Sequence, residues 1–189
     1  MDLFEYISVL TSIIIGLGIA HLLRGVAHLV QHPGRHRIYW VHLVWVTYLF
    51  FHLAFWWWWQ FALNDLPVWQ FQNYIFLVIY AVILYLTCAL LFPTDLDDYS
   101  GYEDYYFSRR KWLFGLIGTS YIIDVYDTWL KGADHLLSLG MHYRVVILSY
   151  VLFSAIAMAT TRRSFHAVFA VAVLTHQVYW AFQFWSMQG

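Results

Sequence analysis

Stretches of about 20 mostly apolar residues recur along the chain, and each is bounded by charged or turn-forming residues. A helix of this length and composition crosses the hydrocarbon of a bilayer. Three of the boundaries carry a proline, at Pro33, Pro67 and Pro93, where a helix is expected to end. We therefore expect an all-α, polytopic transmembrane bundle that forms one domain over residues 1–189. Its six expected spans cover residues 4–30, 38–63, 68–92, 111–130, 143–160 and 164–187.

Composition strengthens the membrane interpretation and excludes several other classes. Hydrophobic residues make up 62% of the chain and charged residues only 11%, whereas soluble domains carry about 25% charged residues. The net charge of −1 leaves no basic footprint for nucleic acid. A single cysteine, Cys88, excludes an internal disulfide and a cysteine-based metal cluster. The first residues, MDLFEYISVL, lack a basic segment, so they are expected to begin a retained span.

The distribution of lysine and arginine predicts the orientation. The first, third and fifth connections between the spans, with their flanks, contain eight of these residues, and the opposite side contains only Lys131 and Arg144. Because basic loops stay in the cytoplasm, we expect a protein of the cell membrane with both termini on the non-cytoplasmic side. Residues 94–110, an acidic and tyrosine-rich connection, are then cytoplasmic. The eight residues are Arg24, Arg35, Arg37, Arg109, Arg110, Lys111, Arg162 and Arg163.

Four consecutive tryptophans, residues 56–59, lie near the end of the 38–63 span. The helical rise from Ile38 to Trp56 is about 27 Å, close to the thickness of the hydrocarbon layer. The run is therefore expected at the outer interface, where indole N–H groups reach water and headgroups. Successive residues point in different directions around a helix. We expect Trp57 and Trp58 to anchor the helix and the other two to face the bundle.

Ionisable side chains inside the expected spans are candidates for function, because they are costly in a membrane. The first span contains Glu5 near its outer end and His21 towards its inner end. In the fourth span, Asp124, Asp127 and Lys131 share one stripe, and Lys131 is one turn from Asp127 and can pair with it. Asp124 lies deeper and has no obvious local partner. The alternative is a hydrated helix end whose acids are neutralised by Lys131.

The second and sixth spans carry matching stripes at 3-4 spacing. Both run from inside to outside, so matched residues are expected at similar depth, with His52 and His176 near the middle of the membrane. Two such histidines can ligate a haem b iron, and His42 with His166 would form a second pair. The alternative is that the histidines hydrogen-bond neighbouring helices, at residues such as Tyr80, Thr87 or Gln177. The stripes are His42, Trp45, Leu49, His52, Trp56 and Trp59 in one span, and His166, Phe169, Val173, His176, Trp180 and Gln183 in the other.

Three classes of function remain. We prefer a small proton- or cation-conducting channel or transporter, because it explains both the acids and the histidines. The alternatives are a haem b electron-transfer subunit and a non-catalytic scaffold or assembly subunit of a membrane complex. Trp56, Trp59 and Trp180 would line the outer part of a site. The expected path comprises Glu5, His21, His52, Asp124, Asp127 and His176.

Other chemistry is not indicated by the sequence. The chain contains no P-loop, dinucleotide fingerprint, zincin motif or nucleophile elbow, so an enzyme is not predicted, and no metal is expected beyond a haem iron. Six short helices enclose little interior of their own. We therefore expect lipid as the surrounding medium and a homo-oligomer or a larger membrane complex as the assembly.

Overall fold

A computed structural model describes residues 3–66 and 68–188, and all regular elements in this part of the chain are helices. The short ones are η1 (Phe61–Asp65) and α5 (Ala133–Ser138). Within the described residues, α1, α2, α3, α6 and α7 are long and apolar enough to cross a membrane. The predicted all-helical fold is confirmed, and five helices of this described part, rather than the six expected, have the length and composition of membrane spans. The long helices are α1 (Leu3–Gln31), α2 (Trp40–Gln60), α3 (Phe71–Ala89), α4 (Tyr102–Leu130), α6 (Gly140–Ala159) and α7 (Arg163–Gln188).

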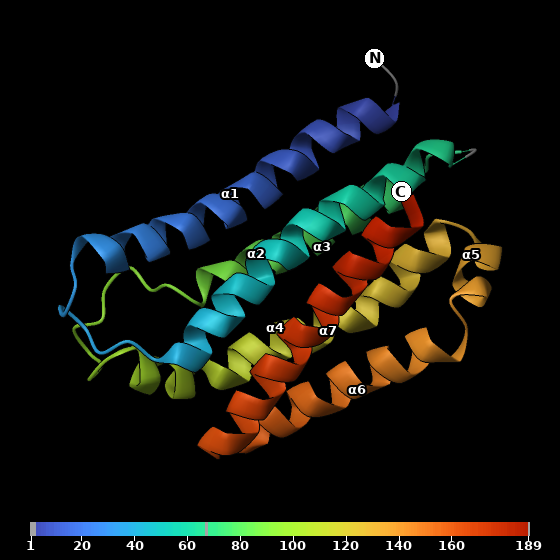
Figure 1. Ribbon diagram of the computed structural model, residues 1–189. Helices are drawn as coiled ribbons and strands as arrows, with labels where there is room; N and C mark the ends of the chain where they lie inside the picture. Colours follow the sequence, from blue (N-terminus) through green and yellow to red (C-terminus); the bar gives the residue numbers. More distant parts are fainter. Residues whose placement is uncertain (1–2, 67, 189) are drawn as a thin grey trace.

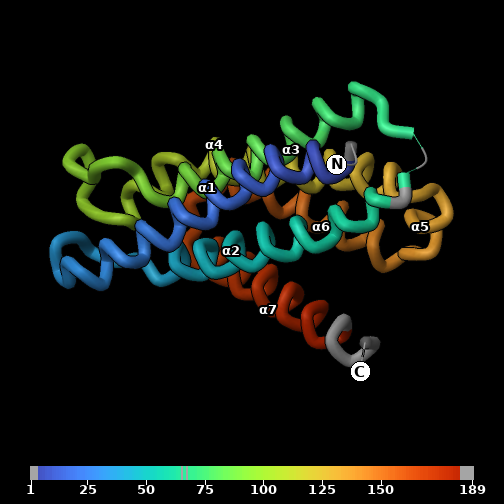
Figure 2. The backbone as a smooth tube through the Cα atoms, turned by 90° about the horizontal axis from the view of Figure 1, so that it is seen from above, coloured from blue at the N-terminus to red at the C-terminus, as the bar shows by residue number. Residues whose placement is uncertain are grey.

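The six long helices pack side by side in one bundle (Figures 1 and 2). Helices α2 and α4 lie centrally, with α1 and α3 on one flank and α6 and α7 on the other. Helix α4 packs most extensively against α6, and α1 against α3. Helices α2 and α7 run in the same direction and contact each other, as their matching stripes predict.

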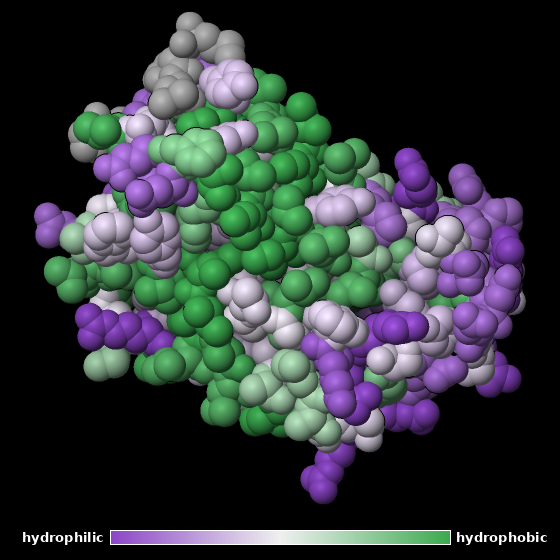
Figure 3. All heavy atoms as spheres, turned by 180° about the vertical axis from the view of Figure 1, so that it is seen from behind, coloured by the Kyte–Doolittle hydropathy of each residue, from purple (hydrophilic) through white to green (hydrophobic). Residues whose placement is uncertain are grey.

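The connections fall at two opposite ends of the bundle (Figure 1). Residues 32–39, 90–101 and 160–162 lie together at one end, here called the basic end. The backbone N–H of Tyr102 donates to the Arg37 carbonyl at 3.1 Å, and Arg163 pairs with Glu103 at 2.5 Å. The first turn of α4 therefore contacts both the 32–39 connection and the start of α7. A broad apolar surface separates this polar end from the other (Figure 3). That distribution is typical of a bundle surrounded by lipid.

Helix α4 begins at Tyr102 and not at Lys111, so the expected 94–110 connection is wrong over its second half. Tyr102, Tyr105 and Tyr106 are all buried, which ties the first turns of α4 to the bundle. Two acids, Glu103 and Asp104, occupy the first turn. Negative charge is favourable there because it faces the positive end of the helix dipole.

A cluster of aromatic rings fills the interior between the middle of the bundle and the basic end. The Trp45 ring is completely buried. It meets Phe114 of α4 edge-on at 5.2 Å between ring centroids and Phe169 of α7 at 5.3 Å. These three residues, called the aromatic plug below, join α2, α4 and α7 without a polar contact between them.

Close packing of α1 against α3 depends on glycine. A Cβ added at Gly25 would overlap the ring of Phe92, whereas nothing lies within 4 Å of a Cβ added at Gly16. Phe92 is itself held by His42, whose ring lies edge-on at 5.0 Å between centroids. The small residues of the first span therefore allow a close helix approach at Gly18 and Gly25, but not at Gly16.

This difference predicts opposite outcomes for two alanine substitutions in one helix. G25A is expected to lower the free energy of unfolding by about 1–3 kcal/mol, because Phe92 must move out of a packed position. G16A is expected to be neutral or to stabilise the helix by up to about 1 kcal/mol. Thermal unfolding in detergent measures both. Equal midpoints for the two variants would contradict the observed contact between Gly25 and Phe92.

Candidate functional site

Asp127 lies in the interior of the bundle and pairs with Lys131. Its side chain is 1% exposed, and the Lys131 ammonium lies 2.6 Å from Oδ2. The Gln60 side chain of α2 donates a hydrogen bond to the same oxygen at 3.1 Å. Because residues four apart share a helix face, this ion pair follows from local spacing. The predicted pairing of Lys131 with Asp127 is confirmed.

Asp124 lies one turn earlier on the same face of α4 and is held by two tyrosines. The Tyr80 hydroxyl of α3 donates to Oδ1 at 3.1 Å, and the Tyr143 hydroxyl of α6 donates to Oδ2 at 2.9 Å. Thr128 and Tyr143 join hydroxyls at 3.1 Å. The expectation that Asp124 lacks a partner therefore holds only within its own helix. Its partners come from two other helices.

These residues form one polar cluster, called the acid site below: Gln60, Tyr80, Asp124, Asp127, Lys131 and Tyr143. It contains two carboxyl groups and one ammonium group, so ionised side chains leave one negative charge in excess. Two of its buried acceptors, Asp127 Oδ1 and Gln60 Oε1, have no hydrogen-bond partner among the described residues. Buried acceptors without donors are unfavourable. The acid site is therefore suited to a proton or a cation.

A second group of polar side chains begins one turn before Asp124. The hydroxyls of Tyr48 and Tyr121 form a short hydrogen bond, and Tyr48 also lies 3.4 Å from His52 Nδ1. The Tyr121 ring stacks on Tyr150 at 4.3 Å, and the Tyr150 hydroxyl is 3.0 Å from His176 Nδ1. The result is a continuous row of tyrosine and histidine side chains from α2 to α7.

The described side chains do not fit a haem between His52 and His176. Both nitrogens of His176 already have partners, because Trp180 Nε1 donates to Nε2 at 3.0 Å and Tyr150 contacts Nδ1. The stacked rings of Tyr121 and Tyr150 lie between the two histidines, where a haem would have to bind. Tyr121 contacts His52, and Tyr150 contacts His176. Within the described residues, no group of three or more His, Cys, Asp or Glu side chains is placed to hold a metal ion.

The second histidine pair, His42 and His166 near the basic end, does not fit an iron either. His166 contacts the Tyr106 hydroxyl through Nδ1 at 2.9 Å and the Thr160 carbonyl through Nε2 at 3.1 Å. His42 Nε2 donates to the carbonyl of Leu91 at 2.6 Å. These contacts agree with the alternative in which histidines bond helices together.

His21 belongs to a different cluster, at the carboxyl end of α3. Its Nε2 lies 3.0 Å from the Phe92 carbonyl, next to the bond from His42 to Leu91. Tyr105 donates to the Leu90 carbonyl at 2.9 Å. Three side chains from α1, α2 and α4 thus satisfy three successive carbonyls that have no helical donor.

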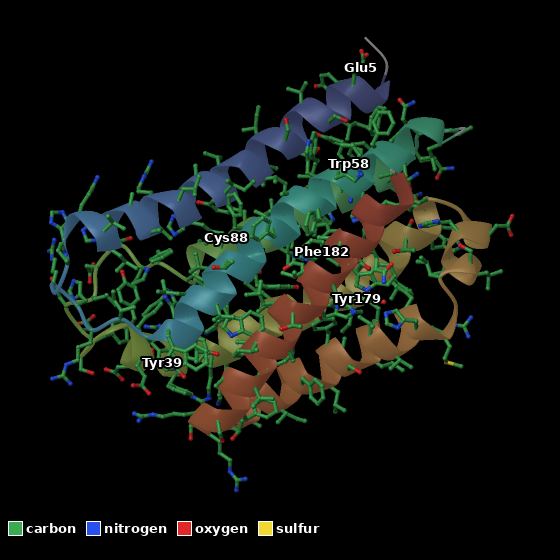
Figure 4. The ribbon with its side chains drawn as sticks, viewed as in Figure 1. Glu5, Tyr39, Trp58, Cys88, Tyr179 and Phe182 are labelled. Carbon is green, nitrogen blue, oxygen red and sulfur yellow. The ribbon has the colours of Figure 1, made fainter. Side chains whose placement is uncertain are left out.

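The predicted path residues therefore fall into four places. Asp124 and Asp127 come together in the acid site, and His52 with His176 lies in the tyrosine–histidine row. His21 is at the end of α3. Glu5 is exposed on α1, at the end of the bundle opposite the basic end (Figure 4).

Of the three aromatics expected to line a site, only Trp56 is buried. Its ring meets Tyr80 edge-on at 5.1 Å between centroids, next to the acid site. Trp59 and Trp180 are 43% and 42% exposed. Trp58 (Figure 4) is 60% exposed, as expected of an interfacial anchor.

The tyrosines are the site residues that sequence reasoning missed. Tyr80 was expected to bond a histidine and instead bonds Asp124. A tyrosine in an apolar span is a usable signal, because a buried hydroxyl requires a partner. Gln177, also expected beside a histidine, does lie there. With its amide oriented to match its neighbours, it accepts from the His52 backbone N–H at 2.8 Å.

No family model, curated protein sequence or solved structure matches this chain. The fold and the polar clusters define an all-helical protein with several helices able to span a membrane.

Proposed function

We propose that the chain crosses the membrane six times, with α4 as the sixth span. The support is the division of its surface: Ser120 and Asp127 are buried, while Trp112, Ile122 and Trp129 are exposed and apolar. Its 29 residues correspond to roughly 43 Å of helix, more than the hydrocarbon thickness. With the basic end in the cytoplasm, both termini lie on the opposite side.

We further propose that the protein is a proton- or cation-coupled transporter that loads its ion at the acid site. The observation that carries this proposal is the excess of buried acceptors: two carboxyls against one ammonium, with Asp127 Oδ1 and Gln60 Oε1 lacking donors among the described residues. A proton or a cation at this site supplies the missing positive charge. The tyrosine hydroxyls at Asp124 can rotate to donate to a carboxylate or to accept from a carboxylic acid.

The aromatic plug favours a transporter over an open channel. Trp45, Phe114 and Phe169 are all buried between the acid site and the basic end. An ion that reaches Asp124 therefore meets packed rings on its way to that end. This obstacle is removed if the helices move so that the acid site opens first to one side of the membrane and then to the other. Such movement is the alternating access of transporters.

Flux through liposomes containing the purified protein tests this function. D124N is expected to reduce the ion-coupled flux at least about tenfold, because an amide keeps the shape of the side chain but not its charge or its exchangeable acid proton. D134N, at an exposed acid of α5, is the matched control and is expected to leave flux unchanged. A pH-sensitive dye inside the vesicles follows protons, and ion-selective dyes follow Na⁺ and K⁺. Equal flux in the native protein, D124N and protein-free vesicles would remove this proposal in favour of a scaffold.

A further inference from the structure

A pocket of about 450 Å³ lies at the turn between α6 and α7. This turn is at the basic end of the bundle (Figure 1). It is separate from the acid site and from the tyrosine–histidine row. Its lining comes from the last turn of α6, the 160–162 connection and the first turns of α7. The lining residues are Ile156, Thr160, Arg162, Ser164, Phe165 and Val168.

The lining is polar on one side and apolar on the other. Thr160, Arg162 and Ser164 belong to the turn or lie beside it. Ile156 and Val168 lie four to six residues further along their helices, roughly 6–9 Å towards the apolar surface. Both are exposed, and Val168 is 69% exposed. The pocket therefore extends from the polar membrane edge into the depth of the acyl chains.

The charge of the pocket is positive. No acidic side chain lines it. The neighbouring Arg163 is paired with Glu103, while Arg162 takes part in no ion pair among the described residues. The side-chain Oγ1 of Thr160 accepts a hydrogen bond from the Arg162 backbone N–H at 3.2 Å. The hydroxyl hydrogen of Thr160 is therefore available for donation. One guanidinium and two hydroxyls thus meet at the rim, a set of donors that suits a phosphate.

We propose that this pocket binds an anionic phospholipid. The phosphate contacts Arg162, Thr160 and Ser164, and an acyl chain lies along Ile156, Phe165 and Val168. Charge complementarity and the change from polar to apolar lining together identify the occupant, because a soluble phosphate compound uses only the rim. This binding does not depend on ion transport at the acid site.

Native mass spectrometry of the full chain, released from nanodiscs of phosphatidylglycerol and phosphatidylcholine, tests the proposal. The native protein is expected to retain phosphatidylglycerol in preference to phosphatidylcholine. R162Q is expected to weaken this retention about fivefold, which corresponds to one arginine at a membrane surface. V168W fills the apolar part of the pocket at an exposed position and is expected to weaken it as well, with the charge unchanged. K111Q, another exposed basic residue at the same end, is the matched control and is expected to behave as the native protein does.

Three results would overturn the assignment. Equal losses in R162Q and K111Q would show general attraction to a basic surface, and equal retention of the two lipids would remove the role of charge. Displacement of phosphatidylglycerol by millimolar inorganic phosphate would show that the rim alone binds a free anion. R162Q is expected to lose lipid retention while its ion flux stays unchanged. This result would show that lipid binding at the pocket is independent of the acid site.

Discussion

Replacing Lys131 with methionine is expected to lower the free energy of unfolding by about 3–5 kcal/mol. The reason is the environment of its partner: the Asp127 side chain is 1% exposed and the ammonium lies 2.6 Å away. Without that ammonium, Asp127 and Asp124 are two acids in one buried site, and Gln60 alone donates to Asp127 Oδ2. Thermal or denaturant unfolding in detergent, followed by tryptophan fluorescence, measures the loss.

Two further variants make the result specific. The D127N/K131M double variant is expected to recover much of the stability, because it removes the unpaired charge together with its partner. K111M changes the only other lysine of the chain, which is exposed, and is expected to stay within about 0.5 kcal/mol of the native protein. If K131M and K111M unfold at the same midpoint, the Asp127–Lys131 pair is not buried in solution.

Trp45 is expected to be the most sensitive single position of the apolar interior. W45A should cost about 3–5 kcal/mol, because it removes a completely buried ring that contacts aromatic residues of α4 and α7. The same variant opens the aromatic plug and is expected to raise passive proton leakage into liposomes. Both quantities, the unfolding midpoint and the leak rate, come from one preparation.

W58A is the matched control for this substitution. Trp58 is on the same helix but 60% exposed, so its loss is expected to change stability by about 0.5 kcal/mol or less. A W45A protein as stable and as tight to protons as W58A would show that the plug does not close the interior.

The length and position of most helices could be predicted because each depends on a continuous local pattern. Apolar runs of sufficient length end at Pro33, Pro67 and Pro93, and α1, η1 and α3 end two to four residues before these positions. The start of α4 could not be predicted in the same way. Tyr105 and Tyr106 are buried against protein and not against lipid, so hydropathy treats this segment as a polar connection.

The acid site shows the same limit at the level of side chains. The Asp127–Lys131 pair was predictable because both residues lie on one face of one helix. The partners of Asp124 were not, because Tyr80 and Tyr143 depend on the relative register of three helices. The hydrogen-bond partners of the histidines could not be assigned for the same reason. Spacing places His176 at a given depth, but only the neighbouring helix brings the Tyr150 hydroxyl to it.

The carbonyls at the end of α3 have a consequence for how the chain is assembled during synthesis. His21 and His42 belong to helices that are made before α3, whereas Tyr105 belongs to the helix made after it. Two of the three donors are therefore present when α3 enters the membrane, and the third arrives with the first turns of α4. These three carbonyls can thus all be satisfied before α6 and α7 leave the ribosome. Helices α6 and α7 then pack against helices α2 and α4, which already carry Trp45 and Phe114.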